Sequence, residues 1–378
     1  MALRGLKVIE LAGLAPAPFC GMILSDFGAT VTRIDKPDTY TDKDSLSRGK
    51  RSLSLDLKKT AAAHIITKLC STADVLIDPY RPGVLEKYNL DPSVLCKVNP
   101  ALIFARMTGF GQNGPFAKMA GHDINYIAIS GVLSMIGGKD KPQAPINLLG
   151  DFAGGGLICA LGICLALLER HKSGKGQVID ANMVAGSAYV SSFLWTTKYA
   201  NIPIWLGPRG TNVLDGGTHF YNTYRTKDGK FMSVGAIETK FYSLLCKGLG
   251  VDPEKCPQFD NWDENIEMFS KIFLTKTQEE WCKIFDLTDA CVAPVLPMEE
   301  AHHHPHNSCK GTFICSDEKV VPSPAPTLSR TPAAVKLTEP LNGQHSIEIL
   351  REEGFSSEEI KKYIDDKVVH ALNVKSSL

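Results

Sequence analysis

The amino-acid sequence predicts an α/β protein that consists of a large domain and a smaller α+β domain. First, residues 6–34 contain an apolar strand, a short helix and a second apolar strand, which is the order of a βαβ unit. Second, strands and helices continue to alternate as far as about residue 199. Third, the pattern changes after Pro203 to a β-hairpin and a group of helices. A chain of 378 residues is long enough for two domains.

Apolar periodicity and turn residues define the individual elements. Strands of the large domain are expected where short apolar runs end in turn residues, at 6–11, 31–34, 52–57, 74–77, 102–107 and 177–181. Helices of this domain are expected at 19–26, 61–70, 92–98, 157–170 and 183–199. In the smaller domain the turn signal Lys227-Asp228-Gly229 predicts a hairpin, and helices are expected at 239–249, 263–274 and 277–285.

The C-terminal part of the chain is expected to return to the large domain. Residues 321–333 contain four prolines, which favours an extended linker. Two helices are predicted after it, at 346–353 and 357–364, and Ser356 begins the second with a Ser-x-x-Glu pattern. We therefore place the first part of the large domain at 1–220, the smaller domain at 221–318, and the segment that completes the large domain at 319–378.

Composition and charge exclude several classes of function. The chain has 41 basic and 41 acidic residues, and this balance argues against a general role in binding nucleic acid or a membrane surface. Eleven cysteines without C-x-x-C spacing indicate buried thiols in a reducing compartment. The apolar run at 158–168 is too short for a membrane span, so none is expected. The histidines at 302–306 lack zinc spacing, so we expect no metal site and interpret this segment as a polar loop.

The segment from Gly121 to Gly156 carries the strongest indication of chemistry. His122 follows a glycine and Asp151 precedes three glycines, so each residue is expected near the start of a helix. The unpaired N–H groups of a helix start favour negative charge. A run of glycines weakens a helix, which indicates close approach of a ligand or of another backbone. The alternatives to an acid/base pair are a capping aspartate and a structural histidine.

A basic cluster surrounds the strand predicted at 52–57. The cations are Arg48, Lys50, Arg51, Lys58 and Lys59. Ligands of α/β proteins bind at strand ends, so the cluster favours a phosphate-bearing ligand, although a solvated face is the commoner meaning of such charges. The pattern G-x-G-x-x-G is absent from the opening βαβ unit, which argues against an NAD enzyme.

Four motifs give a resemblance to a known family. They are Ser47–Lys58, Gly121–Asp123, Asp151–Gly156 and Gly174–Gln177, and they follow one another over much of the chain. Together they resemble the class III CoA-transferase family (CaiB/BaiF). The resemblance implies a Rossmann-like large domain with a smaller α+β domain, in an interlocked homodimer whose two chains thread through each other. It also implies a CoA thioester substrate and no metal or redox cofactor.

The resemblance assigns roles to individual residues. His122 and Asp151 match two acid/base groups, and Glu238 matches a carboxylate near the histidine. Contacts with the CoA substrate are implied for Lys36, Leu55, Asp56, Leu57, Lys58, Gly121, His122, Asp123, Ile124, Asn125 and Tyr126. Lys36 stands where the family commonly has arginine, so the charge is kept but the bidentate fork is lost. Arg81 is a further phosphate candidate.

Within this family, His122 distinguishes two kinds of chemistry. Together with Asp151 it suits proton removal from one face of the carbon next to a thioester and proton return to the other face. The implied activity is racemisation of (R)- and (S)-2-methylacyl-CoA, both branched fatty acyl-CoA and bile-acid precursors, through an enolate. The N–H groups of Asp151 and the following glycines are expected to bind the enolate oxygen. The alternatives are a class III CoA-transferase with Asp151 as nucleophile and a non-catalytic acyl-CoA-binding protein.

The C-terminal residues resemble a targeting signal. Ser376-Ser377-Leu378 resembles the peroxisomal signal Ser-Lys-Leu without its basic middle residue, and Lys375 lies one place upstream. The alternative is a frayed tail without a signal. Residues 1–7 belong to the first strand and are too short for a transit peptide. We expect a peroxisomal protein with a mitochondrial pool, and recognition of the tail by a peroxisomal import receptor.

Overall fold

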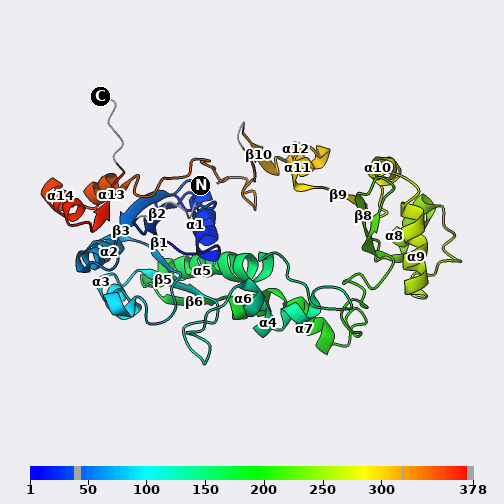
Figure 1. Cartoon of the computed structure of the whole chain (residues 1–378), viewed down its shortest axis with the longest axis horizontal. Helices are drawn as coiled ribbons and strands as arrows, with labels where there is room; N and C mark the ends of the chain where they lie inside the picture. The colour runs from blue at the N-terminus through cyan, green and yellow to red at the C-terminus, as the bar shows by residue number, and fades with distance from the viewer. Residues whose placement is uncertain (38–43, 317–318, 373–378) are drawn as a thin grey trace. The chain divides into compact units, whose positions relative to one another are not determined.

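The computed structural model describes residues 1–37, 44–316 and 319–372 (Figure 1). The chain forms two compact units. Unit 1 contains residues 1–132, 145–190 and 324–378, and unit 2 contains residues 133–144 and 191–323. Our domain boundaries at 220 and 318 follow the sequence pattern and remain predictions.

Unit 1 is built on a sheet of seven strands in the described part of the chain. Their order is β12 (Val369–His370), β3 (Arg51–Leu55), β2 (Thr30–Asp35), β1 (Lys7–Leu11), β4 (Val75–Asp78), β5 (Ile103–Thr108) and β6 (Val178–Asn182). Strands β1 to β6 are parallel, and β12 pairs antiparallel with β3. The strand order reverses between β1 and β4, because the chain first moves outward to β3 and then continues on the other side of β1. The predicted α/β class is confirmed.

The strands are buried on both faces. Val8 lies in one apolar core with residues of α1 (Pro16–Asp26) and α5 (Ile158–Ser173). Its neighbour Ile9 lies in a second core with residues of α2 (Thr60–Thr72) and α13 (Ser346–Glu352). This alternation is the period of two that a strand imposes on its side chains. The other helices of unit 1 are η1 (Glu86–Tyr88), α3 (Pro92–Val98), α4 (Asp123–Ile129), η3 (Leu148–Leu157), α6 (Met183–Val190) and α14 (Ser357–Asp365), and η2 (Val132–Met135) begins at its boundary with unit 2.

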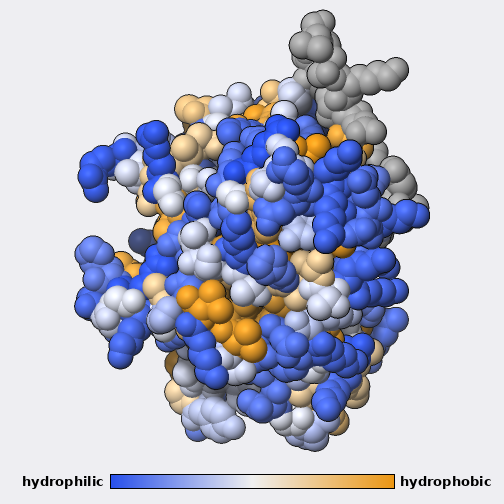
Figure 2. Space-filling model, turned by 90° about the vertical axis from the view of Figure 1, so that its left-hand side faces the viewer, coloured by the Kyte–Doolittle hydropathy of each residue, from blue (hydrophilic) through white to orange (hydrophobic). Residues whose placement is uncertain are grey.

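The outer surface beside α13 and α14 is mainly polar. Figure 2 looks onto this side of the molecule and shows a largely hydrophilic surface with separate hydrophobic patches. Ile360 is the one fully buried residue of α14, and the partly buried Tyr363 and Ile364 also pack against the core, so three apolar side chains anchor this helix. The helix begins with the predicted capping box, since Ser356 accepts a hydrogen bond from the Glu359 N–H group and Glu359 accepts one from the Ser356 N–H group.

Unit 2 contains its own core. Strands β7 (Tyr221–Arg225), β8 (Phe231–Gly235) and β9 (Val292–Val295) form an antiparallel sheet, and the predicted hairpin turns at Gly229. Its largest buried side chains include Tyr224, Phe269 and Trp281. The remaining elements are α7 (Ser192–Tyr199), α8 (Thr239–Leu249), α9 (Trp262–Phe273), α10 (Gln278–Phe285), α11 (Met298–Ala301), α12 (Pro305–Lys310), β10 (Phe313–Cys315) and β11 (Val320–Pro322).

The glycines that precede α5 allow helices to approach one another. A Cβ atom on Gly186 of α6 would lie 1.8 Å from the carbonyl oxygen of Gly154 in η3. A Cβ atom on Gly156 would lie 2.7 Å from a ring carbon of Phe19 in α1. Contact with neighbouring protein atoms therefore explains these glycines.

Two local predictions are wrong, and the position of Asp151 differs in detail. Asp151 lies near a helix start as expected, in the first turn of the π-helix η3, but it is the fourth residue of that helix and Asn147, in a left-handed conformation, is the N-cap. The helix expected at 183–199 divides into α6 and α7 near Ser191. The histidine-rich loop includes α12, which Pro305 begins, since proline suits the first position of a helix.

Helices η3 and α5 join into one long helical segment, Leu148–Ser173. Among the described residues it is the one segment whose length and apolar composition suffice to cross a membrane. Core helices meet the same criterion, and Cys159, Ala160 and Ile163 of α5 are buried against the sheet. The segment is a weak indication, so the absence of a membrane span remains a prediction.

Candidate active site

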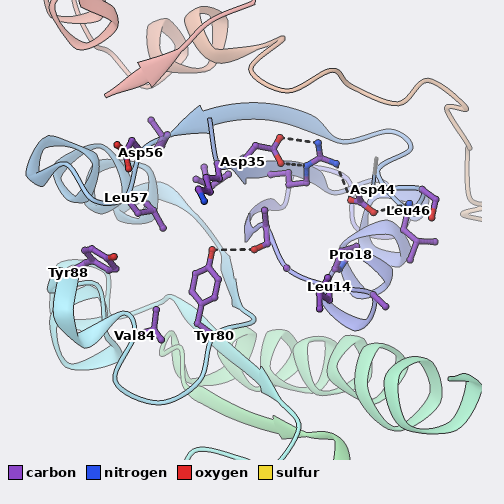
Figure 3. Close-up of a pocket in the computed structure, with 18 of the residues that line it drawn as sticks. Leu14, Pro18, Asp35, Asp44, Leu46, Asp56, Leu57, Tyr80, Val84 and Tyr88 are labelled. Atoms are coloured by element: carbon purple, nitrogen blue, oxygen red, sulfur yellow. Dashed lines mark hydrogen bonds and ion pairs between the residues drawn. The ribbon is translucent and has the colours of Figure 1, made fainter. Parts of the chain in front are cut away.

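A cavity of about 950 Å³ lies at the carboxyl ends of β1, β2, β3 and β4 (Figure 3). Its lining consists of residues 12–15, Pro18, residues 33–36, 44–46 and 55–58, Tyr80, Val84, Tyr88 and Phe152. The loops after β1 and β4 diverge because the strand order reverses between these strands. This is the usual ligand position of an open α/β sheet.

The charged side chains of the cavity differ in their exposure. Arg33 forms a bidentate pair with Asp35, at 2.7 and 2.9 Å, and a third bond of 3.0 Å to Asp44 (Figure 3). Its guanidinium is therefore committed to carboxylates of the protein. Lys36 and Lys58 are exposed lining residues, and they are the better candidates to meet the anionic part of a ligand.

The predicted coenzyme contacts fall into two groups. Lys36 and residues 55–58 all line the cavity, as expected of residues that follow β2 and end β3. Arg81 is not among the lining residues, and its guanidinium donates a hydrogen bond of 2.9 Å to the carbonyl oxygen of Lys118. A phosphate contact at Arg81 remains a prediction.

His122 is the N-cap of α4. Its N–H group donates to the side-chain oxygen of Asn125 at 3.1 Å, and its carbonyl accepts the Asn125 N–H group at 2.8 Å. The imidazole is exposed. The frame around it is tight, because Tyr126 donates its hydroxyl proton to the Gly121 carbonyl and its ring occupies the place of a Cβ atom on Gly109. The backbone of His122 is thus fixed while its ring can reach a ligand.

Asp151 is held on two sides in a buried position. Its side chain accepts a hydrogen bond of 3.0 Å from the Asn147 amide, and its N–H group donates to the Asp123 carboxylate at 2.7 Å. Burial raises the pKa of Asp151 and the charge of Asp123 adds to this, whereas the Asn147 hydrogen bond and the charge of His122 oppose it. The expectation that the Asp151 N–H group binds an enolate oxygen is wrong, since that group already has an acceptor.

The side chains of residues 121–126 differ in their burial. Asp123, only 1% exposed, and Tyr126 are buried, whereas His122, Ile124 and Asn125 are exposed. The Asp123 carboxylate faces the backbone of Gly150 and Asp151, where a Cβ atom on Gly150 would approach it to 2.6 Å. In the ligand-free molecule, Asp123 therefore supports Asp151.

Glu238 belongs to unit 2, where it is the N-cap of α8. Its carbonyl accepts the N–H groups of Phe241 and Tyr242, both at 2.9 Å. The proximity of Glu238 to His122 remains a prediction. Within the described ranges, no group of three or more histidines, cysteines or carboxylates is arranged to hold a metal ion.

The sequence reasoning missed much of the cavity lining and the residue that holds Asp151, and three of the missed residues show why. Asn147 holds the Asp151 carboxylate, Phe152 connects η3 with the cavity, and Tyr80 forms part of the cavity wall. Tyr80 follows the end of β4 in a Pro-rich turn, a pattern that could have indicated a lining residue. The positive φ of Asn147, a conformation that asparagine tolerates, has no equally clear sequence signal.

The parallel sheet, the cavity at its strand ends and the glycine-rich helix junction together define the class of protein. Residues 3–346 match the model of CoA-transferase family III, and the chain belongs to this family. The solved structure of a CAIB/BAIF family protein from Brucella suis superposes with a TM-score of 0.77 at 24% identity, covering 93% of this chain and 99% of that one. The predicted family and fold are confirmed.

The chain is also similar to proteins of named activity. It is 55% identical to the alpha-methylacyl-CoA racemase of Homo sapiens and 54% identical to that of Mus musculus, with all of both chains covered in each comparison. It is 28% identical to the succinyl-CoA–L-malate CoA-transferase beta subunit of Chloroflexus aurantiacus, with 98% of each chain covered. The family therefore contains two activities, and the racemases are much the more similar.

Proposed function

We propose that the protein is a racemase that interconverts (R)- and (S)-2-methylacyl-CoA thioesters. The observation that carries the proposal is the electrostatic pairing of an exposed imidazole, His122, with a buried carboxylate, Asp151, whose chain neighbour Phe152 lines a cavity of about 950 Å³. Full-length identity of 55% to a racemase supports the same activity.

In the proposed reaction His122 and Asp151 act on opposite faces of the carbon next to the thioester. One group removes the proton and the other returns a proton, and the roles exchange in the reverse direction. The burial that raises the pKa of Asp151 suits a carboxylate that must both accept and donate. The hydrogen bond from Asn147 keeps its side chain in one orientation.

The enolate oxygen needs a donor that is already in place. The N–H group of Asp151 is bound to Asp123, so we transfer this role to the first turn of α4. There the N–H groups of Asp123 and Ile124 directly follow His122, which brings donor and acid/base group onto one element.

We infer that the coenzyme portion of the substrate occupies the cavity. Lys36 and Lys58 are the cations proposed to meet its phosphates. The reaction requires no metal or redox cofactor, since the thioester carbonyl acidifies the proton and the protein supplies both acid/base groups. Branched fatty acyl-CoA and bile-acid precursor acyl-CoA are the two substrate series to compare.

A class III CoA-transferase is the second candidate, because family members of that activity align with the whole length of the chain. In that case the Asp151 carboxylate would attack the thioester carbonyl, the C–S bond would break with CoA leaving as its thiolate, and an acyl anhydride would form on Asp151. A non-catalytic acyl-CoA-binding protein is the third. Incubation of a chiral 2-methylacyl-CoA in deuterated water, with and without an acceptor acid, separates the three, because a transferase needs the acceptor and a binding protein changes nothing. The proposal expects racemisation with uptake of deuterium at the α-carbon, and retention of both the proton and the configuration would refute it.

We also propose that the active form is an interlocked homodimer. Support comes from an apolar stripe on one face of the segment formed by η3 and α5, where Leu157, Leu161, Leu165 and Leu168 are all about half exposed or more. A row of leucines at this spacing is unusual on a free surface. Sedimentation velocity tests the state, and a monomer at micromolar concentration would contradict the proposal.

The proposed location is the peroxisome, with a second pool in mitochondria. The tail Ser376–Leu378 lies outside the described residues. Its resemblance to Ser-Lys-Leu supports recognition by a peroxisomal import receptor. The test is to image the protein in cells with and without Ser376–Leu378. Unchanged co-localisation with a peroxisomal marker after the deletion would show that the tail is not the address.

A further inference from the structure

One buried arginine joins the two ends of the loop that forms a wall of the cavity. This loop, residues 79–88, follows the end of β4, includes η1 and carries Tyr80, Val84 and Tyr88 of the lining (Figure 3). Arg106 of β5 donates through Nε to Asp78 at 3.1 Å and through an Nη atom to Glu86 at 3.0 Å. Asp78 precedes the loop and Glu86 lies near its end, so one guanidinium holds both.

Each of the two carboxylates also holds the backbone of the loop. The second oxygen of Asp78 accepts the N–H group of Tyr80 at 2.8 Å, and the second oxygen of Glu86 accepts the N–H group of Gly83 at 2.8 Å. Gly83 has a φ of +88°, a conformation that suits the turn between them. The loop is therefore fixed at two internal points through carboxylates that Arg106 orients.

The ion pair between Arg106 and Asp78 lies within the sheet and not at its surface. Arg106 stands directly opposite Asp78 in the register of β5 and β4, and both side chains are buried. Burial raises the pKa of Asp78 to about 6 although the Tyr80 N–H group and Arg106 oppose this. A buried carboxylate that loses its cation is destabilised, so the loop anchor depends on Arg106.

The fixed loop bridges the point where the strand order reverses. The Tyr80 hydroxyl donates a hydrogen bond of 3.2 Å to the carbonyl of Ala12, which follows β1 and also lines the cavity (Figure 3). Movement of the loop would therefore change the distance between the β1 and β4 sides of the cavity. Asp78, Glu86 and Arg106 do not themselves line it, so any effect on a ligand passes through the wall.

We propose that Arg106, acting with Asp78 and Glu86, is a positioning residue that sets the cavity wall for the coenzyme part of the substrate. The inference rests on the proposed function, since it requires that a CoA thioester binds in this cavity. Its signature is a loss of affinity with the chemical step preserved, because His122 and Asp151 lie on other elements.

The test compares Arg106→Met, Arg106→Lys and Glu86→Gln in the full-length protein. Free CoA is titrated by calorimetry, and kcat and KM are measured from α-proton exchange of 2-methylacyl-CoA in deuterated water. Arg106→Met is expected to raise both the CoA Kd and KM about tenfold and to leave kcat within about twofold. Arg106→Lys keeps the charge but not the fork and is expected to recover part of the affinity. Glu86→Gln, which removes the outer anchor, is expected to have a smaller effect.

Arg170→Met is the matched control. Arg170 pairs with Asp74 at 2.7 Å, and Asp74 directly precedes β4 at the end remote from the cavity. This variant removes an arginine–aspartate pair from the opposite end of β4, so it reports the effect of lost stability alone. Thermal midpoints are recorded for both variants, and Arg170→Met is expected to bind CoA within about twofold of the parent.

Three results would overturn the positioning role. They are CoA binding by Arg106→Met within twofold of the parent, an equal affinity loss in Arg170→Met, and a loss confined to kcat. If Arg106→Met does not fold, the CoA affinity of Glu86→Gln is the deciding measurement. A CoA affinity of Glu86→Gln equal to that of the parent would then overturn the positioning role. A parent protein that binds no CoA would refute the proposed function itself, so the two failures are distinguishable.

Discussion

The cavity and the proposed catalytic region are both parts of unit 1, but they are built by different means. The cavity is formed by loops after parallel strands, and ion pairs such as Arg33–Asp35 fix its polar wall. The catalytic region, which we define as His122, Asp123, Asn147 and Asp151, is formed by packed helices. The positions of these side chains depend on close backbone contact between the helices and on the buried carboxylate of Asp123.

This difference separates two kinds of effect. Exposed cations at strand ends can be changed one at a time, because solvent screens their charges and the sheet beneath them is unaffected. Residues between packed helices cannot be changed so freely, because a displaced helix moves every group that it carries. We therefore expect variants in the cavity to alter affinity and variants in the catalytic region to alter rate or stability.

The largest effect is expected from loss of either acid/base group. His122→Ala or Asp151→Asn should lower the rate of racemisation by about 10²–10⁴-fold, because each residue serves one face of the carbon. The measurement is α-proton exchange with a chiral substrate in deuterated water. CoA binding and the thermal midpoint should stay near the parent values. Racemisation within a few-fold of the parent in either variant would refute the two-base assignment.

The next effect concerns the helix contact that carries Asp151. Gly186→Ala should destabilise the protein by about 1–3 kcal/mol or more, because the new methyl group would overlap the Gly154 carbonyl. Gly162→Ala in α5 is the control. A Cβ atom on Gly162 would lie 3.4 Å from its nearest neighbouring atom, which is an ordinary contact, and alanine is more favourable than glycine in a helix by about 0.5–1 kcal/mol. Urea unfolding measures both. Equal stability of the two variants would show that the close approach of Gly186 to the Gly154 carbonyl is not required for stability.

A smaller effect is expected in the cavity. Lys58→Ala should weaken acyl-CoA binding by about 0.2–1 kcal/mol, up to roughly fivefold, because an exposed cation contributes little more. The loss should shrink with added salt. Lys59→Ala is the control, since Lys59 is the next residue but does not line the cavity. Calorimetric titration of acyl-CoA at two salt concentrations measures the loss of affinity. A fall in the saturated rate with unchanged affinity would contradict a role of Lys58 in binding.

The finest test concerns pH. Asp123→Asn removes the negative charge that helps to raise the pKa of Asp151, so that pKa should fall. In the direction in which Asp151 removes the proton, the acid limb of the rate profile should then move to lower pH. Asn147→Gly, which keeps the left-handed backbone but loses the hydrogen bond that lowers the pKa, should move the limb to higher pH. Shifts of the same sign in both variants would contradict this account.

The strands and the cavity could be predicted from the sequence because their signals are local. A short, mainly apolar segment such as Lys7–Leu11, with Val8, Ile9 and Leu11, identifies a strand, and the carboxyl ends of parallel strands meet at one edge. The sequence could therefore place Lys58 at this edge of the sheet, where it lines the cavity. The family resemblance then supplied the roles of His122 and Asp151, which periodicity alone left open.

The catalytic region could not be predicted in detail because its determinants are distant in sequence. The bond between Asp123 and the Asp151 N–H group joins residues 28 positions apart. Asp151 has the sequence features of a helix cap, yet Asn147 begins the helix four residues earlier, because a positive φ at Asn147 starts the turn. The glycine run had two possible explanations, and only the position of α6 and α1 distinguished them.

Strand β12 has a consequence for how the protein is made. Val369 and His370 pair with Leu55 and Ser54, and the Asp56 N–H group donates to the Val368 carbonyl at 2.9 Å. Two residues of the cavity wall, Leu55 and Asp56, are thus supported by residues synthesised more than 300 positions later. On the ribosome, the nascent chain must keep this sheet edge open until Val368 has emerged. The edge is accessible to chaperones during that interval, and a prematurely terminated chain would carry an incomplete cavity.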